Sequence, residues 1–309
     1  MPLSNKHAII YDRIKIQPEI NALQGNFGNE DSVQVSMLRL DKIHPVISGN
    51  KLFKLRYFLE EANNSTHKTI ITFGGAYSNH LAATAFACKA EGIRCVGIVR
   101  GDESPSLSPT LRFCIENGMQ LAFVSRDTYR NIDDKFREGL LSKYGHHTLM
   151  PEGGFAIKGA KGAEDIMKLF NEEDYSHICC PVGTATTLGG LINGSDNYTC
   201  ILGFNVLKNL NDIEERLKKL NVTRAVMCKI IDDYHFGGYA KKNPALIKFM
   251  NDFYTENGIP LDFVYTGKMM FGVSELVKGN YFPAGSRILC IHTGGLQGNS
   301  SLPSGMLHF

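Results

Sequence analysis

The chain has 309 residues, of which 43% are hydrophobic and 21% are charged, and its formal net charge is +2. This is the composition of a globular protein with enough apolar material for one large or two modest cores. The small net charge and the lack of a basic cluster with interleaved aromatic residues argue against nucleic acid as a partner. No apolar run reaches the ~20 residues that cross a bilayer, and no signal-peptide pattern opens the chain, so we expect a cytoplasmic protein without a membrane partner.

The sequence contains eight cysteines, most of them within apolar segments. None forms a C-x-x-C pair or a Cys/His spacing typical of a metal site. We therefore expect reduced, buried thiols, with no metal site and no disulfide framework.

The first half of the chain alternates β-rich runs with helical patterns. Residues 1–43 predict irregular structure with short strands, and the alternation over 32–38 is typical of an edge or surface strand. Strand, helix and strand at such short intervals predict a parallel α/β layer. The expected strands and helices that follow are strands 69–73, 95–99 and 120–124, a helix over 81–90, and a helix that begins at Ser108-Pro109 and ends near Gly118.

A second α/β series follows Pro151-Glu152-Gly153-Gly154. No repeat or low-complexity linker separates the two series, so we expect any two lobes to be closely packed. The expected elements are helix 160–170, strand 177–182, a helix from Leu188, strand 199–204, helix 210–220 and strand 288–292.

Lys51 lies where a turn becomes an amphipathic helix. Pro45 and Gly49 break regular structure before it. Such a position can hold an amine toward a ligand, and the ammonium of Lys54, one turn further on, would lower the pKa of a partly buried amine. The alternative is that both are solvated surface lysines. The apolar residues at helical spacing are Leu52, Leu55, Leu59 and Ala62.

Residues 183–187, Gly-Thr-Ala-Thr-Thr, follow a hydrophobic run and open a predicted helix. Their backbone amides and three threonine hydroxyls could bind a phosphate at the positive end of the helix dipole. The turn lacks the lysine of a Walker loop and the G-x-G-x-x-G spacing, which argues against nucleoside triphosphates and NAD. An ordinary turn between strand and helix is the alternative.

Three other turns place polar side chains near predicted strand ends. In Ser78-Asn79-His80 the serine could cap a helix whose free amides receive a carboxylate, although a plain N-cap gives the same pattern and His80 alone favours a structural role. Tyr265 and Thr266 offer a phenol and a hydroxyl at a glycine turn, or the tyrosine packs on the core. Thr293 ends a strand at the edge where open α/β sheets bind ligands. No H-E-x-x-H, G-x-S-x-G or paired-carboxylate motif competes with these turns.

An ordered set of motifs between residues 38 and 300 resembles the pyridoxal-phosphate enzyme family that contains D-cysteine desulfhydrase and 1-aminocyclopropane-1-carboxylate (ACC) deaminase, within the tryptophan synthase β fold group. The resemblance implies an α/β fold of two open, twisted, mostly parallel sheets flanked by helices. It implies a large cofactor-binding domain (1–50 and 151–309) and a small domain (51–150). Pyridoxal 5'-phosphate as cofactor, a small amino acid as substrate and a homodimer are also implied. The motifs are SGNKLFKLRYFLEEA, GGAYSNHLAATA, PEGGFAIKGAKG, PVGTATTLGGL, VYTGK and IHTGG.

The same resemblance implies a role for each matching residue. Lys51 is similar to the lysine that binds the cofactor covalently, and Asn79 to the asparagine that faces the pyridoxal 3-oxygen. Ser78 and His80 match the neighbours of the substrate carboxylate, with Ser78 among the catalytic residues. The remaining matches are the phosphate loop Gly183, Thr184, Ala185, Thr186 and Thr187, the catalytic Tyr265 over the substrate, Thr266 beside it, and Thr293 near the pyridine nitrogen.

Thr266 and Thr293 favour one activity of the family. ACC deaminases typically carry Glu and Leu there, whereas D-cysteine desulfhydrases resemble this chain in having threonine. A carboxylate near the pyridine nitrogen suits the opening of a cyclopropane that has no α-hydrogen, and a neutral hydroxyl suits loss of an α-proton and of a β-leaving group. We expect D-cysteine to give pyruvate, ammonia and hydrogen sulfide. The alternatives are an ACC deaminase that forms 2-oxobutanoate and ammonia, and a catalytically silent ligand-binding homologue.

Three departures from the family pattern bear on the pocket. Ala185 and Ser48 stand where relatives usually have glycine, and an alanine in the phosphate loop narrows the backbone conformations open to it. Residues 81–84 are less polar than the usual continuation after Ser-Asn-His. The expected identity of the substrate is the prediction most exposed to these changes.

Overall fold

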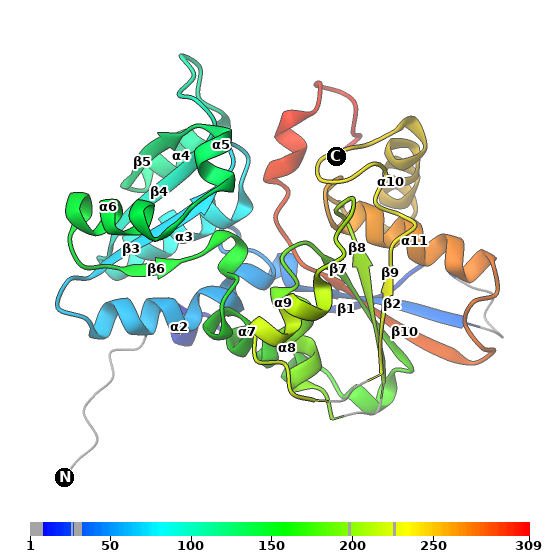
Figure 1. Cartoon of the computed structure of the whole chain (residues 1–309). Coiled ribbons are helices and arrows are strands. Elements are labelled where there is room, and N and C mark those ends of the chain that lie inside the picture. The colour runs from blue at the N-terminus through cyan, green and yellow to red at the C-terminus, as the bar shows by residue number, and fades with distance from the viewer. Residues whose placement is uncertain (1–8, 26, 28–32, 197–198, 225–226) are drawn as a thin grey trace, which may run out of the picture.

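The structure is a computed structural model that describes residues 9–25, 27, 33–196, 199–224 and 227–309. These residues form a six-stranded sheet in the order β1-β2-β10-β7-β8-β9 and a four-stranded sheet in the order β5-β4-β3-β6, which lie side by side in Figure 1. Every strand pair is parallel except β1 with β2. The strands are β1 (Ile20–Ala22), β2 (Val33–Arg39), β3 (Thr69–Gly74), β4 (Arg94–Arg100), β5 (Met119–Val124), β6 (Thr148–Met150), β7 (His177–Val182), β8 (Cys200–Asn205), β9 (Cys228–Ile231) and β10 (Ser286–His292).

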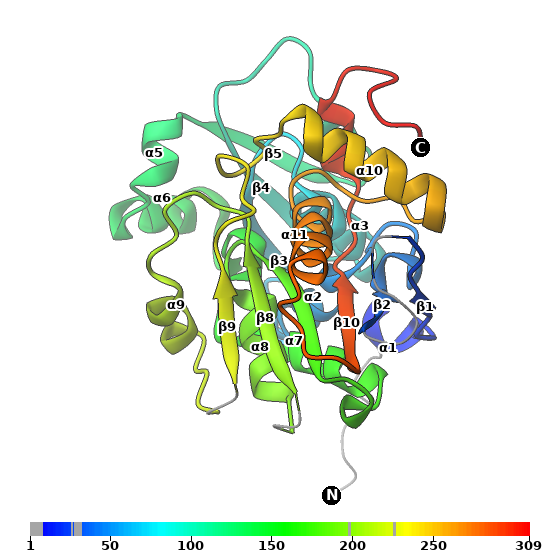
Figure 2. The same ribbon diagram turned by 90° about the vertical axis from the view of Figure 1, so that its right-hand side faces the viewer.

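Helices flank both sheets, which confirms the predicted fold class (Figures 1 and 2). On one face of the six-stranded sheet lie α10 and α11, and on the other α7, α8 and α9. No helix of the described residues is long and apolar enough to cross a membrane. The helices are α1 (Ile10–Arg13), α2 (Asn50–Asn64), α3 (Asn79–Glu91), α4 (Pro109–Glu116), α5 (Arg126–Arg130), α6 (Asp134–Tyr144), α7 (Ile157–Ala163), α8 (Thr186–Gly194), α9 (Ile213–Lys219), α10 (Pro244–Asn257) and α11 (Thr266–Lys278), with 3-10 turns η1 (Leu40–Lys42), η2 (Glu152–Gly154), η3 (Glu164–Leu169), η4 (Glu172–Asp174) and η5 (Gln297–Ser301).

The apolar strands of the central layers were well predicted. All six residues of β3 are buried, and parallel strands covered on both faces read as continuous apolar runs. The strands predicted over 69–73, 95–99, 120–124, 177–182, 199–204 and 288–292 are confirmed as β3, β4, β5, β7, β8 and β10, each within one or two residues.

The strand expected over 32–38 is confirmed as β2, but its expected place at an edge of the sheet is wrong. Residue 32 lies outside the described part, and β2 runs from Val33 to Arg39 between β1 and β10. The true edge is β1, three residues long and antiparallel to β2. A run as short as Ile-Asn-Ala carries no periodic signal, so the sequence could not reveal the strand that covers β2.

Two of the predicted helices begin or end at other residues than the observed ones. The helix expected over 160–170 is split into α7 and the 3-10 turn η3, and the one expected over 210–220 shortens to α9. The helix expected from Ser108-Pro109 is confirmed as α4, where the Ser108 hydroxyl accepts from the Leu111 amide at 3.1 Å. Helices α10 and α11, which cover one face of the six-stranded sheet, were not predicted.

A single apolar cluster extends from the six-stranded sheet through α7, α8 and α2 to the four-stranded sheet. It includes Ile178 of β7, Leu188 of α8, Phe53 of α2 and Ile70 of β3, each no more than 1% exposed. The two sheets are therefore closely packed, as expected. The division into units 1–50 with 151–309, and 51–150, stays a prediction.

The contact between α2 and α7 is close because Gly162 has no side chain. A Cβ atom at this position would lie 2.0 Å from the backbone oxygen of Phe53. Because this oxygen belongs to the backbone of α2, it cannot move without distorting the helix. The two helices would therefore have to separate.

We therefore expect Gly162→Ala to lower the free energy of unfolding by about 2 kcal/mol, because overpacking outweighs the gain in helix propensity. Urea unfolding measures this change. The matched control is Gly139→Ala on the exposed face of α6, where a Cβ meets nothing within 4 Å, and which should be neutral or stabilising. A Gly162→Ala protein as stable as the original would contradict the close contact.

Candidate active site

One cavity of about 430 Å³ opens between the two sheets. It is lined by residues at or just after the carboxyl ends of strands from both sheets: Gly75 after β3, Arg100 at the end of β4, Gly183 after β7 and Thr293 after β10. The carboxyl edge of parallel strands is where α/β folds bind ligands. The cavity also contains Lys51, Ser78, Asn79, His80, Thr184, Ala185, Thr186, Thr187 and Tyr265.

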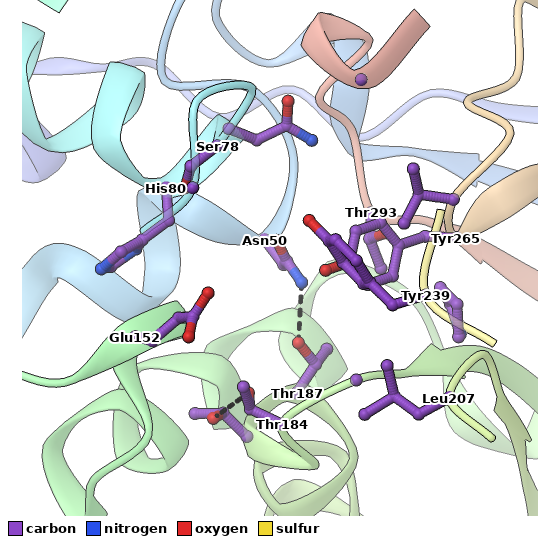
Figure 3. A pocket seen from close by; sticks show the side chains of 18 of the residues that line it. Asn50, Ser78, His80, Glu152, Thr184, Thr187, Leu207, Tyr239, Tyr265 and Thr293 are labelled. Atoms are coloured by element: carbon purple, nitrogen blue, oxygen red, sulfur yellow. Dashed lines mark hydrogen bonds between the residues drawn. The ribbon is translucent and has the colours of Figure 1, made fainter. Parts of the chain in front are cut away.

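Asn50 fixes the start of α2 within this cavity. Its amide donates to the Thr293 carbonyl at 3.0 Å, and its side-chain amide donates to the Thr187 hydroxyl at 2.7 Å (Figure 3). Gly49, at φ +69°, permits this approach, since a Cβ there would lie 1.8 Å from the Thr293 oxygen. Lys51 Nζ donates to the Asn50 Oδ1 atom at 2.7 Å. Asn50 thus joins three predicted site segments, although the sequence analysis gave it no role.

Lys51 and Lys54 are both removed from bulk water. Lys51 is partly buried and Lys54 is 6% exposed, so the alternative of two solvated surface lysines is wrong. Burial lowers the pKa of Lys51 to about 8, against the opposing charge of Asp262. The pKa of Lys54 falls to about 7 through burial and the charge of Lys51. Repulsion between the two amines therefore depresses the pKa of Lys54, whereas we had expected it to act on Lys51.

The segment 78–80 is the amino-terminal turn of α3. Ser78 Oγ accepts from the Leu81 amide at 3.2 Å, which is an N-cap bond. The Asn79 side chain donates to the Gly295 carbonyl at 3.0 Å, while its Oδ1 atom is buried without a hydrogen-bond partner among the described residues. An orphaned buried acceptor in a cavity marks a place for a bound donor or water.

His80 is a buried neutral imidazole rather than an exposed ligand. Burial, with the charges of Lys54 and Lys51, lowers its pKa to about 3. Its Nε2 atom lies 2.8 Å from the Thr72 hydroxyl, and its Nδ1 atom has no partner among the described residues. His80 lines the cavity, but in a form that cannot act as a cation.

The threonine turn lies at the amino terminus of the nine-residue helix α8. Ala185 adopts φ +65°, the left-handed region that the glycine of relatives enters without strain, and an L-residue there costs about 1 kcal/mol. The hydroxyls of Thr184 and Thr186 lie 2.8 Å apart (Figure 3). The turn therefore gathers hydroxyls and free amides at the positive end of the helix dipole, which suits an anion.

Asp262 shapes the turn that carries Tyr265. Its carboxylate, 1% exposed, accepts from the backbone amides of Val264, Tyr265 and Thr266 at 2.9, 2.7 and 2.9 Å and from the Thr266 hydroxyl at 2.7 Å. Thr266 is thereby committed to Asp262 and does not line the cavity. The expected contact between Thr266 and a substrate therefore has no support in the geometry.

Tyr265 and Tyr239 share one wall of the cavity (Figure 3). Their ring centroids are 6.2 Å apart, edge to face. Burial and the neighbouring acidic groups raise the pKa of Tyr265 well above its ordinary value, so this phenol is a proton donor at neutral pH.

Tyr239, Arg100 and Glu152 line the cavity but were not singled out from the sequence. Two features of the sequence could have indicated Arg100 and Glu152 as site residues. Arg100 directly follows the predicted strand 95–99, and Glu152 lies in the PEGG motif already noted. Tyr239 follows Gly237 and Gly238 in a segment that no strand or helix pattern covers.

Comparisons with known proteins identify the family of the chain. The family described as pyridoxal-phosphate dependent enzyme matches residues 25–294. A Thermotoga maritima protein named "Putative 1-aminocyclopropane-1-carboxylate deaminase" is 31% identical over 280 residues, covering 84% of this chain and 88% of that protein. The D-cysteine desulfhydrase of Salmonella choleraesuis is 26% identical over 285 residues, covering 84% and 86%. The crystal structure of an ACC deaminase homologue superposes with a TM-score of 0.80 at 26% identity, over 93% of this chain and 91% of that one.

The chain belongs to the pyridoxal-phosphate dependent enzyme family, and its cofactor is pyridoxal phosphate. The residues present fit that group. A partly buried amine with a lowered pKa suits an aldehyde, the hydroxyl-rich turn suits a phosphate, and an unpartnered Asn79 oxygen lies in the same cavity. Among the described residues, no group of three or more His, Cys, Asp or Glu side chains could hold a metal ion.

Asp262→Ala should lower the free energy of unfolding by about 3 kcal/mol, because it leaves three buried amides and a hydroxyl without their acceptor. Urea unfolding tests this, with Asp252→Ala as the control, since Asp252 is exposed on α10 and pairs with Lys248, which is also exposed. The control should change stability by less than about 0.5 kcal/mol. A loss below 1 kcal/mol for Asp262→Ala would show that the turn does not depend on this carboxylate.

Proposed function

We propose that the protein is a D-cysteine desulfhydrase that converts D-cysteine and water to pyruvate, ammonia and hydrogen sulfide. The single observation that carries this proposal is the gathering of Lys51, Ser78, Tyr265 and the threonine turn around one cavity of about 430 Å³. A cavity of this size accommodates the cofactor together with a small amino acid and little else.

We propose that Lys51 binds the cofactor and that residues 183–187 hold its phosphate. Lys54, whose Nζ donates to the Gly153 carbonyl at 3.2 Å, lies in the same cavity, and a nearby phosphate would favour its charged form. Asn79 and Thr293, which line the same cavity, would bind polar atoms of its ring. When bound, pyridoxal phosphate supplies an electron sink that stabilises negative charge at the substrate α-carbon.

The pKa shifts of Lys51 and Tyr265 have opposite directions, so we assign each residue a different proton transfer. Lys51, whose pKa is lowered to about 8, is the base that takes the α-proton once it is free. Tyr265, whose pKa is raised, keeps its proton and donates it to the sulfur as the carbon–sulfur bond breaks. Water then converts the released enamine to pyruvate and ammonia. Transfer of the α-proton from Lys51 to the Tyr265 phenolate restores both residues, so the reaction balances.

Ser78 and the first amides of α3 would bind the substrate carboxylate. The helix dipole and the free amides of its first turn favour an anion at this point. The Ser78 hydroxyl already accepts from Leu81, so its own proton remains available for donation to the carboxylate.

The choice of D-cysteine rests on Thr293, a hydroxyl on the wall of the cavity at the position where ACC deaminases typically carry leucine. Thr266 supports it only indirectly, because its hydroxyl is bound to Asp262. ACC deaminase is the second candidate, favoured by the name of the 31% identical relative. A silent ligand-binding homologue is a third, and the partly desolvated Lys51 amine argues against it.

We also propose that the protein is a cytoplasmic homodimer with a large and a small domain. The gathering of β3, β4, β5 and β6 in one sheet and of the other strands in a second sheet supports the two domains. The dimer is what the family resemblance implies. Light scattering of the purified protein tests the subunit number.

Two measurements test the proposed function. The purified protein should show a visible absorption band that disappears in Lys51→Ala, which separates an enzyme from a silent binder. Products should then be compared for D-cysteine, L-cysteine, D-serine and ACC at equal concentrations. Pyruvate and sulfide should form fastest from D-cysteine, and a protein that acts on ACC alone, giving 2-oxobutanoate, would overturn the proposal.

A further inference from the structure

Lys268, in the first turn of α11, is a lysine enclosed by the protein, with 1% of its surface exposed. Its ammonium donates to the carbonyl oxygens of Gly238 at 2.6 Å and His235 at 2.9 Å, and lies 3.5 Å from that of Val206. A buried ammonium destabilises a fold unless it is hydrogen-bonded, and the helix dipole disfavours a cation in this turn. Such a residue calls for a reason beyond packing.

The segment bound by Lys268 has an unusual backbone. Phe236 and Ala240 both adopt φ +53°, and Gly237 and Gly238 between them adopt +90° and +113°. For residues other than glycine this conformation is unfavourable and persists only where the surroundings impose it. Residues 236–240, with four positive φ angles, therefore need contacts from outside the segment that hold this backbone conformation.

The ammonium binds the same carbonyl groups that close the turn. The amide of Gly238 donates to the His235 oxygen at 3.0 Å, and the amide of Lys241 donates to the Gly238 oxygen at 3.0 Å. Both oxygens therefore accept one bond from the turn and one from Lys268. The third oxygen, of Val206, directly follows β8, so the turn is tied to the sheet as well as to α11.

This anchored turn carries a wall of the cavity. Tyr239 follows Gly238 directly, and Tyr265 precedes Lys268 by three residues. The two rings contact each other edge to face in the cavity (Figure 3). The Arg100 guanidinium lies 6.0 Å from the Tyr239 ring centroid. Tyr239 itself is 45% exposed, so side-chain burial alone does not fix it.

We propose that Lys268 is a positioning residue whose ammonium clamps residues 235–238 and so holds Tyr239 against Tyr265 in the cavity. Its positive charge is the essential feature, because an apolar side chain of similar volume would fill the space but leave the His235 and Gly238 oxygens with only their bonds within the turn. The clamp itself does not depend on the reaction. Its kinetic consequence rests on the proposed function.

Hydrogen exchange of the cofactor-free protein tests the clamp directly. In Lys268→Met the amides of Gly238 and Lys241 should exchange at least ~10-fold faster, because the carbonyls that bind them lose their anchor. The matched control is Lys278→Met in the last turn of the same helix, where the side chain is 49% exposed and pairs with Glu275. Unchanged exchange in a folded Lys268→Met protein would overturn the proposal, whatever substrate the enzyme uses.

Chemical rescue separates the charge from the packing. Lys268→Ala removes the atoms that propylammonium can replace, and 1-propanol matches its carbon chain without the charge. Propylammonium should slow exchange of the Gly238 and Lys241 amides again and lower a KM that we expect to be raised about 10-fold, with kcat changing less. Rescue by 1-propanol as well, or by neither compound, would overturn the role of the ammonium.

A third measurement uses the unmutated protein in case the variants do not fold. Under native-state exchange in increasing urea, the amides of Gly238 and Lys241 should open with the same free energy as the buried amides of α11, such as that of Val273. Opening of the turn at a clearly lower free energy than α11 would contradict the clamp.

Discussion

The site depends on keeping the Lys51 amine out of water at the point where the carboxyl ends of two parallel sheets meet. Burial lowers the pKa of this amine to about 8 against the opposing charge of Asp262, and burial together with the charge of Lys51 lowers the pKa of Lys54 further, to about 7. Neither shift needs a special catalytic partner. Both follow from the helix α2 being packed between the sheets rather than on the surface.

Several contacts serve this one placement. Gly49 lets the chain pass against Thr293, and Asn50 then ties the start of α2 to both Thr293 and Thr187. Gly162 allows α7 to approach α2 closely. A backbone hydrogen bond and the Asn50 side chain therefore connect the start of α2, which carries Lys51, to the anion-binding turn. These contacts fix the position of the amine relative to that turn.

A second group of contacts, centred on charged side chains, builds the opposite wall. The Asp262 carboxylate organises the turn of Tyr265, and the Lys268 ammonium organises the turn of Tyr239. Asp262 also acts on the pKa of both Lys51 and Lys268. Buried charges that are fully hydrogen-bonded specify one local conformation, which a site with two adjacent tyrosines requires.

The sequence predicted the parts of the molecule that have local signals. Apolar runs predicted β3, β4, β7, β8 and β10, and ordered motifs predicted the family, its cofactor and the turns that line the cavity. It failed where the cause was non-local. The edge strand β1, with three residues, is too short to show an alternation of apolar and polar side chains. The burial of Lys54 depends on residues far along the chain, such as Gly153.

Thr266 illustrates the same limit. The motif placed it beside Tyr265 and predicted a contact with substrate, yet its hydroxyl is bound by a carboxylate four residues earlier. No sequence pattern predicts Asp262 as the acceptor of the Thr266 hydroxyl, because these hydrogen bonds form only in the turn at the start of α11. Likewise, Tyr239 lies after β9 of one sheet and Arg100 ends β4 of the other, so the two meet only in the folded protein.

The most direct test is to find which lysine binds the cofactor. The protein loaded with pyridoxal phosphate is reduced with borohydride, digested, and the modified residue identified by mass spectrometry. The account predicts the added mass on Lys51, which donates to Asn50 at the edge of the cavity. Modification of Lys54 instead, or of neither lysine, would contradict it.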